Sequence, residues 1–189
     1  AWTYRLVVPG GGDDDPGIAS WAVLDDGRTV VRIVREGSGG RPADMVYEQS
    51  LGEYDVSAAR RIEVRVRLRV LAQSLPLGGM RGTELPAMVK LVGEAANGDQ
   101  IAWSVGFYGV EPDPAEPESK YVLDAEVVNV KVAPGEWSEF DSGNLLDADN
   151  DKGFEHLGQP LPARLTRLEI IASGHDYASD IDAVEVWVK

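Results

Sequence analysis

The strongest pattern in the sequence is an alternation of apolar and charged residues between positions 62 and 70. The apolar members are Ile62, Val64, Val66, Leu68 and Val70, and the charged members are Glu63, Arg65, Arg67 and Arg69. Successive side chains of a β-strand point to opposite faces, so this period of two predicts a strand that is buried on one face only. We therefore expect the apolar set to enter a core and the arginines to lie outside it.

Shorter runs of the same kind recur roughly every ten residues, separated by Gly, Pro, Asp and Asn, whereas helical periodicity is nearly absent. The predicted strands span residues 4–8, 20–24, 29–35, 45–51, 62–72, 87–93, 100–108, 121–130, 137–141, 163–172 and 181–188. About ten or eleven short strands in one domain of 189 residues predict an all-β fold, an antiparallel two-sheet β-sandwich with jelly-roll topology.

Turns and loops follow from the residues between these runs. Residues 25–27 (Asp-Asp-Gly) and 97–99 (Asn-Gly-Asp) are typical of tight hairpin turns, because Gly and Asn tolerate positive φ. Residues 9–17 and 111–119 combine prolines with clustered acids and cannot sustain a strand, so they are predicted to be mobile surface loops of a single domain spanning 1–189.

Composition narrows the function classes. The chain carries 18 Lys and Arg against 32 Asp and Glu, a net charge of −14, which disfavours binding to nucleic acid. With no Cys and only two His, disulfides, thiol nucleophiles and a multi-histidine zinc centre within one chain are not expected. No apolar run approaches the roughly 20 residues of a membrane-spanning helix. We expect a monomer that does not insert into membranes.

The predicted strand 100–108 offers a candidate binding surface. Ile101, Trp103, Val105 and Phe107 share one face and are assigned to the core. The reverse face carries Ala102, Ser104, Gly106 and Tyr108. Small residues leave room for a ligand to approach the sheet, so Tyr108 is the preferred aromatic candidate for stacking on a sugar ring.

Two passages resemble the galactose-binding-domain-like jelly rolls shared by many carbohydrate-binding modules. One is residues 46–57 followed by the long strand, and the other is the closing segment 179–186, in which an Asp precedes an alternating apolar run. A narrower similarity joins residues 73–79, 84–89, 103–108, 142–146 and 172–175 to the C-terminal sandwich domain of large bacterial envelope proteins, some with a FecR-like region. It covers residues 20–188.

These resemblances imply a fold and a location more than a chemistry. They imply an exported, tethered module without assigned catalysis, located outside the cell or in the cell envelope. Members of the narrower family carry a cysteine pair around the loop after the long strand, whereas this chain has Gly78 and Leu85 at those positions.

Two sets of carboxylates are candidate calcium ligands. Asp147, Asp149 and Asp151 alternate in a loop closed by Gly153, as in oxygen-ligand calcium loops, but the glutamate at the twelfth position of an EF-hand is missing. A solvated acidic turn is the alternative. Asp182 is predicted to share the face of the last strand's valines, and in jelly-roll binding modules the matching Asp commonly helps hold structural calcium. A capped turn is the competing interpretation of Asp182.

The arginine stripe of Arg65, Arg67 and Arg69 also has two interpretations. Exposed ion pairs with acids on facing strands would explain it without a ligand. As a functional site, the stripe would capture an anionic sugar or a carboxylated partner through planar bidentate contacts.

Catalysis has little support in the sequence. Residues 173–177 contain Ser, His and Asp, but such neighbours do not form a triad and Gly-x-Ser-x-Gly is absent, so His175 is expected to bond a backbone group in a turn.

The leading hypothesis is a noncatalytic glycan-binding module that uses Tyr108 and the arginine stripe. The alternative is a protein-interaction or spacer domain in an envelope assembly, marked by an exposed apolar patch or strand edge. A glycoside hydrolase ranks third and requires two facing carboxylates, one with a raised pKa.

Overall fold

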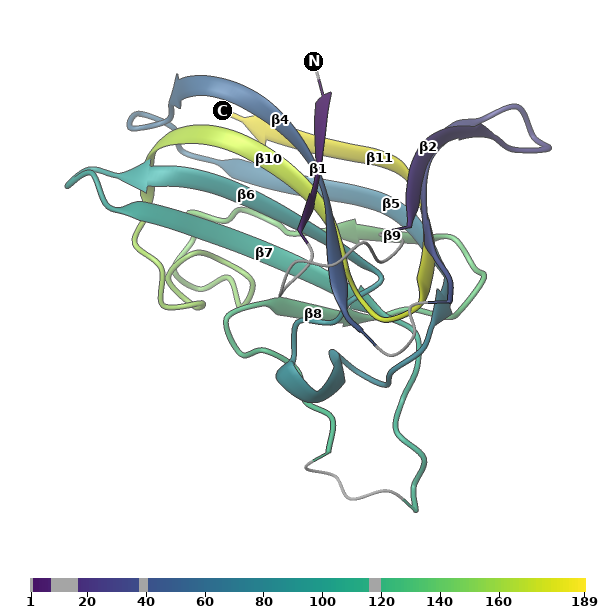
Figure 1. Ribbon diagram of the computed structural model, residues 1–189. Coiled ribbons are helices and arrows are strands. Elements are labelled where there is room, and N and C mark those ends of the chain that lie inside the picture. Colours follow the sequence, from purple (N-terminus) through teal and green to yellow (C-terminus); the bar gives the residue numbers. More distant parts are fainter. Residues whose placement is uncertain (1, 8–16, 38–40, 116–119) are drawn as a thin grey trace.

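The computed structural model describes residues 2–7, 17–37, 41–115 and 120–189, with side chains omitted for residues 4–7 (Figure 1). Its elements are β1 (Trp2–Val7), β2 (Ile18–Val23), β3 (Thr29–Arg35), β4 (Ala43–Asp55), β5 (Ile62–Gln73), a 3-10 turn (Gly79–Arg81), β6 (Ala87–Ala95), β7 (Gln100–Tyr108), β8 (Val128–Lys131), β9 (Ser138–Asp141), β10 (Pro162–Gly174) and β11 (Tyr177–Val188). Of the two loops predicted to be mobile, residues 9–16 and 116–119 lie outside the described residues, and residues 111–115 are described and contain no strand.

These strands form two facing sheets. The six-stranded sheet has the order β1-β4-β10-β6-β7-β8, and the five-stranded sheet has the order β2-β3-β11-β5-β9. The chain crosses between sheets from β4 to β5 to β6 and again from β8 to β11, so strands adjacent in sequence lie in opposite layers (Figure 1). The predicted all-β jelly-roll sandwich is confirmed.

The core lies between the two layers and is filled by the apolar members of each alternation. Ile62 and Val64 of β5 are fully buried, and Trp103 of β7 is fully buried beside them in the same cluster. The indole N–H of Trp103 donates to the Lys152 carbonyl at 2.6 Å, which satisfies its one polar group inside the core. The predicted burial of one face of residues 62–70 is confirmed.

The predicted strand 121–130 is wrong over most of its length. Only Val128–Lys131 is a strand, and it runs parallel to β7, the one parallel pair among the described strands. The preceding residues bond to the loop after β5 instead: the N–H of Val122 donates to the carbonyl of Gly79 at 3.0 Å, and the N–H of Gly78 donates to the carbonyl of Val122 at 3.1 Å. Of its apolar residues, Tyr121 is buried whereas Val122 is 40% exposed, so the segment lacks the buried face of a strand.

Candidate binding face of the five-stranded sheet

The arginine stripe lies on the outer face of β5, with carboxylate-bearing strands on both sides. β9 places Asp141 opposite Arg65, and β11 places Asp180 opposite Arg69. Because facing residues of antiparallel strands lie about 5 Å apart at Cβ, each arginine has an acid within reach of its guanidinium.

Each arginine of the stripe makes an ion pair. Arg65 Nε lies 3.1 Å from an oxygen of Asp141, Arg67 Nη1 lies 3.3 Å from Asp182, and Arg69 Nη2 lies 2.7 Å from Asp180. The side chains of Arg65 and Arg67 remain 49% and 40% exposed. The ion-pair interpretation of the stripe is therefore confirmed, and the side chains of two of its arginines remain partly open to solvent.

Asp180 anchors one end of the stripe. Its side chain is fully buried and receives Nε and Nη2 of Arg32, at 2.7 and 2.9 Å, together with Nη2 of Arg69. Burial by itself raises the pKa of Asp180, but the hydrogen bonds from Arg32 and Arg69 outweigh burial and hold the pKa below its ordinary value. Asp180 was not among the predicted site residues, because the last strand begins at Tyr177 and not at residue 181.

Asp182 faces the same outer surface, contrary to prediction. The register of β11 against β5 shifts between Ile181 and Ala183, so Asp182 is the extra residue of a β-bulge. A bulge re-aims the residue that it inserts. Ile181 enters the core, whereas the Asp182 carboxylate meets Arg28 at 3.0 Å and Arg67 at 3.3 Å. Two guanidinium groups thus contact the Asp182 carboxylate, and the calcium role of this residue stays a prediction.

Trp137 adds an aromatic surface beside the stripe. It precedes β9, and the guanidinium carbons of Arg28, Arg69 and Arg67 lie 4.4, 4.9 and 5.5 Å from its ring centroid. Arg28 comes from the β2–β3 hairpin, where Asp26 also binds it at 2.7 Å. The hairpin, β5 and the segment before β9 thus converge on one half-buried tryptophan.

Two adjacent hollows follow the stripe. The larger, of about 560 Å³, is lined mainly by Arg65, Arg67, Glu139, Asp141, Asp182 and Glu185. The second, of about 340 Å³, is lined by residues 23–26 with Arg32, Arg69 and Trp137. The guanidinium of Arg67, which lines the first hollow, lies 5.5 Å from the ring centroid of Trp137, which lines the second. From Arg65 to Arg69 the rise of β5 is about 13 Å. We call the two hollows together the β5 trough.

The β5 trough holds slightly more negative than positive charge. Five arginines and eight carboxylates line it or pair with its lining residues, namely Arg28, Arg32, Arg65, Arg67 and Arg69, and Asp25, Asp26, Glu63, Glu139, Asp141, Asp180, Asp182 and Glu185. The trough is therefore an array of polar groups already neutralised by their neighbours, and it carries no excess positive charge.

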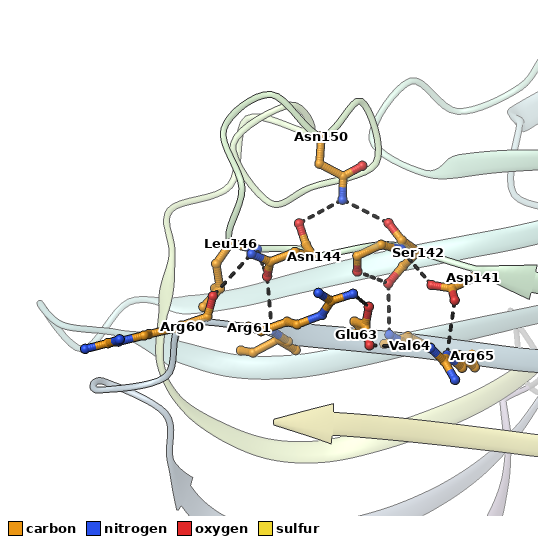
Figure 2. A network of polar contacts seen from close by, with 12 residues as sticks. Arg60, Arg61, Glu63, Val64, Arg65, Asp141, Ser142, Asn144, Leu146 and Asn150 are labelled. Carbon is orange, nitrogen blue, oxygen red and sulfur yellow. Dashed lines mark hydrogen bonds and ion pairs between the residues drawn. The ribbon is translucent and has the colours of Figure 1, made fainter. Parts of the chain in front are cut away.

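The loop that follows β9 is fixed by its own polar contacts (Figure 2). The N–H of Val64 donates to Ser142 Oγ at 2.9 Å, and the N–H of Ile62 donates to Asn144 Oδ1 at 3.2 Å. Asn150 spans the loop by donating to the carbonyls of Ser142 and Asn144, both at 2.9 Å (Figure 2). These bonds extend β9 along β5 and keep Asp141 beside Arg65.

The predicted calcium loop does not gather its carboxylates. Asp147, Asp149 and Asp151 are exposed, and Asp147 Oδ1 accepts the N–H of Asp149 at 3.0 Å in a local turn. Within the described residues, no group of three or more His, Cys, Asp or Glu is placed to hold a metal ion. The amide of Asn150 connects the two sides of this loop.

Tyr108 lies on the other sheet, so it cannot act together with the arginine stripe. It belongs to the outer face of β7 in the six-stranded layer. The small residues beside it accommodate the chain's own loops: a Cβ on Gly106 would lie 2.2 Å from Leu85 Cδ1 and 3.4 Å from Val127 Cγ1. The prediction of one surface carrying Tyr108, Arg65, Arg67 and Arg69 is wrong for this reason.

The Ser, His and Asp residues after β10 have separate partners. His175 Nδ1 lies 2.7 Å from Glu84 Oε2, so it contacts a carboxylate and not the predicted backbone group. Ser173 Oγ donates to Asp44 at 2.6 Å. The structure does not bring these residues together as a nucleophile and its base.

No family model and no curated protein matches the sequence. Among solved structures, the chain is similar to a family 61 carbohydrate-binding module in complex with β-1,4-galactotriose, with 10% identity, a TM-score of 0.45, and coverage of 98% of this chain and 88% of that one. It is also similar to the CBM22-1 xylan-binding domain from Paenibacillus barcinonensis Xyn10C, at 14% identity, a TM-score of 0.42, and 99% and 85% coverage.

An exo-β-agarase is a further structure of similar fold, with 8% identity and a TM-score of 0.49, and the match covers 99% of this chain but 25% of that one. At these identities the likeness concerns the fold. Carbohydrate-binding modules recur among these structures. Of the residues described, none form a helix long and apolar enough to cross a membrane.

Proposed function

We propose that this chain is a noncatalytic glycan-binding module and that its ligand lies along the β5 trough. The supporting observation is the trough itself, in which exposed guanidinium and carboxylate groups surround Trp137 on a rigid sheet. Sites on strands hold their side chains in fixed positions, so little ordering is needed when a ligand binds.

The chemistry of the trough suits sugar hydroxyls. A hydroxyl group both donates and accepts, so it can bridge an arginine N–H and a carboxylate oxygen that lie next to each other. Arg67 with Asp182 and Arg65 with Asp141 offer two such places along one strand. Trp137 adds an aromatic ring against which the C–H face of a pyranose can pack.

The charge balance of the trough favours a neutral glycan over an acidic one. A carboxylated sugar would have to displace a paired acid from an arginine and would meet a small excess of negative charge. We therefore replace the anionic sugar suggested by the arginine stripe with a neutral polysaccharide. The proposal assigns no role to calcium.

The exported or envelope-tethered bacterial setting belongs to the same proposal. It rests on the sequence resemblance to C-terminal sandwich domains of envelope proteins. A hydrolase is less well supported, because the described carboxylates whose pKa departs from the ordinary value, Asp26, Asp55 and Asp180, all have a lowered pKa, whereas a catalytic acid needs a raised one.

Affinity electrophoresis and titration calorimetry against neutral galactan, xylan and glucan, with polygalacturonate as the acidic counterpart, test this proposal. We expect at least one neutral polysaccharide to bind, with little change in affinity between about 0.05 and 0.5 M salt because no net charge is neutralised. Trp137→Ala should weaken binding about tenfold. Failure of every neutral glycan to bind, or tighter and strongly salt-dependent binding of polygalacturonate, would contradict it.

A further inference from the structure

β11 has an open edge over its second half. β3 pairs with β11 only from Tyr177 to Ile181, and beyond the bulge only β5 pairs with it. Lys189 exchanges backbone hydrogen bonds with Arg61 of the β5 side, so by alternation the odd-numbered residues of this half bond to β5. The backbone groups of Val184, Val186 and Val188 therefore point to the open side, where the described part of the chain supplies no strand.

Apolar surface adjoins this edge. A hollow of about 400 Å³ is lined by Leu51, Tyr54, Leu165, Val186, Trp187 and Val188. β1 pairs with β4 only as far as Gln49, so the end of β4 that contributes to the hollow also lacks an outer neighbour among the described strands. Tyr54 and Trp187 are 54% and 46% exposed. The end of β4 in the six-stranded sheet and the second half of β11 in the five-stranded sheet thus both lack an outer neighbour among the described strands.

The edge lacks the usual protection against pairing. Natural edge strands carry prolines, several charges or a bulge that interrupts the ladder. Residues 183–188 (Ala-Val-Glu-Val-Trp-Val) contain no proline and one charge, and the bulge at Asp182 lies before them. This half of β11 presents a regular ladder of donors and acceptors.

We propose that this edge pairs antiparallel with the same edge of a second copy of the chain, joining two five-stranded sheets. The sequence is self-complementary when Trp187 lies on the twofold axis. Val186 then faces Val188 of the partner in a hydrogen-bonded pair, and Glu185 faces Lys189 of the partner as an opposite-charge pair, each occurring twice. The valines' inner side chains would extend the core across the axis.

The charged residues favour this register over the adjacent registers. With Val186 on the axis, Glu185 would face Trp187, and Lys189 would face Ala183, so neither charge would find its opposite. An extended segment of another protein could use the same backbone groups, but the Glu185–Lys189 spacing is explained by a second copy. Two six-residue edges make an interface below the roughly 1,200 Å² of stable complexes, so we expect a dissociation constant on the order of micromolar.

Sedimentation equilibrium of the whole chain over a concentration series tests the pairing, with circular dichroism to confirm folding. Val186→Pro removes an N–H that points to the open side and leaves the β5 ladder intact, so it should raise the dimer dissociation constant roughly a hundredfold. Val186→Ala keeps the N–H and is the matched control, which should change the constant far less.

A charge exchange tests the register. Glu185→Lys and Lys189→Glu each create two like-charge pairs and should weaken the dimer about tenfold, whereas the double variant should restore it. A chain that stays monomeric up to about 1 mM, a Val186→Pro dimer as stable as the wild type, or a double variant as weak as the single ones would each overturn the proposal. The first of these outcomes is the monomer expected from the sequence.

Discussion

The outer faces of the two sheets differ although the same alternation produced both. On the five-stranded sheet, long charged side chains from β5, β9 and β11 stand above the backbone and leave two hollows between them. On the six-stranded sheet, small residues of β7 let Leu85 and Val127 approach the strand directly. The stretch with the larger side chains is the open one, and the small-residue position at Gly106 is covered.

This comparison shows that side-chain size along a strand does not by itself indicate a binding surface. A stretch of small residues allows any neighbouring group to approach the strand closely. Loops of the same chain are present at a far higher effective concentration than a ligand, so they occupy this space first. Long paired side chains keep their own loops away, because covering them would bury charges at a cost in desolvation.

Removing the buried acid of the five-stranded face should have the largest effect. Asp180→Ala leaves Arg32 and Arg69 without their common partner and should lower the free energy of unfolding by about 3 kcal/mol in urea titrations. Asp141→Ala is the matched control, since that carboxylate is 53% exposed and its pair should be worth less than about 1 kcal/mol. Equal losses in both variants would mean that burial does not distinguish these pairs.

Filling the small-residue position of the six-stranded face should come next. Gly106→Ala places a methyl group against Leu85 and should cost about 2 kcal/mol by overpacking. The penalty should shrink in a Leu85→Ala background, because the contact that it strains is gone. A penalty that is the same in both backgrounds would show that Leu85 does not cover Gly106.

Substitutions on the two faces should also differ in their effect on ligand affinity, and this effect should be smaller in free energy than the two changes in stability above. Arg67→Met keeps the aliphatic stem but removes the donors, and it should weaken the neutral glycan about tenfold, near 1.4 kcal/mol. Tyr108→Ala, on the opposite side of the sandwich, should leave calorimetric affinity unchanged. The reverse result would move the binding site to the six-stranded sheet.

Acid should give the smallest effect. The lowered pKa of Asp180 means that the folded state binds its proton less readily than the unfolded state, for which the ordinary value is 3.8. Its stabilising contribution is therefore present above that pH and is lost as the pH falls from there through the lowered pKa. Asp180→Asn should unfold with a shallower pH dependence below about pH 4, measured by thermal denaturation from pH 5 to pH 2.5. An unchanged slope would assign the acid sensitivity to other carboxylates.

Much of the fold could be predicted because its signals are local. The period of two in residues 62–70, the Asp-Asp-Gly and Asn-Gly-Asp turns and the burial of Trp103 all follow from neighbouring residues alone, and all agree with the structure. The segment 121–127 misled the prediction because apolar residues signal burial without saying what buries them. In such a short run, the pattern of apolar residues does not distinguish a loop packed against a sheet from a strand within a sheet.

The candidate site was predicted only in part. The arginine stripe was identified because its three members share one strand, but Trp137, Asp180 and Arg28 reach it from other strands and from a hairpin. Asp182 was assigned to the wrong face because a single bulge reverses the parity of every residue that follows it. Nothing in the local sequence of β11 marks that insertion.

The sequence by itself determined which side chains point inward along strands that contain no bulge, since there the direction depends only on backbone geometry and on the preference of apolar groups for the interior. Tertiary structure alone decided which outward faces meet: it joined Arg67 to Asp182 and Trp137, and it separated Tyr108 from all of them. The physical reason is that packing across the whole sandwich sets the strand order and the bulges. This packing joins residues far apart in the sequence, and a local pattern of apolar and polar residues does not specify such contacts.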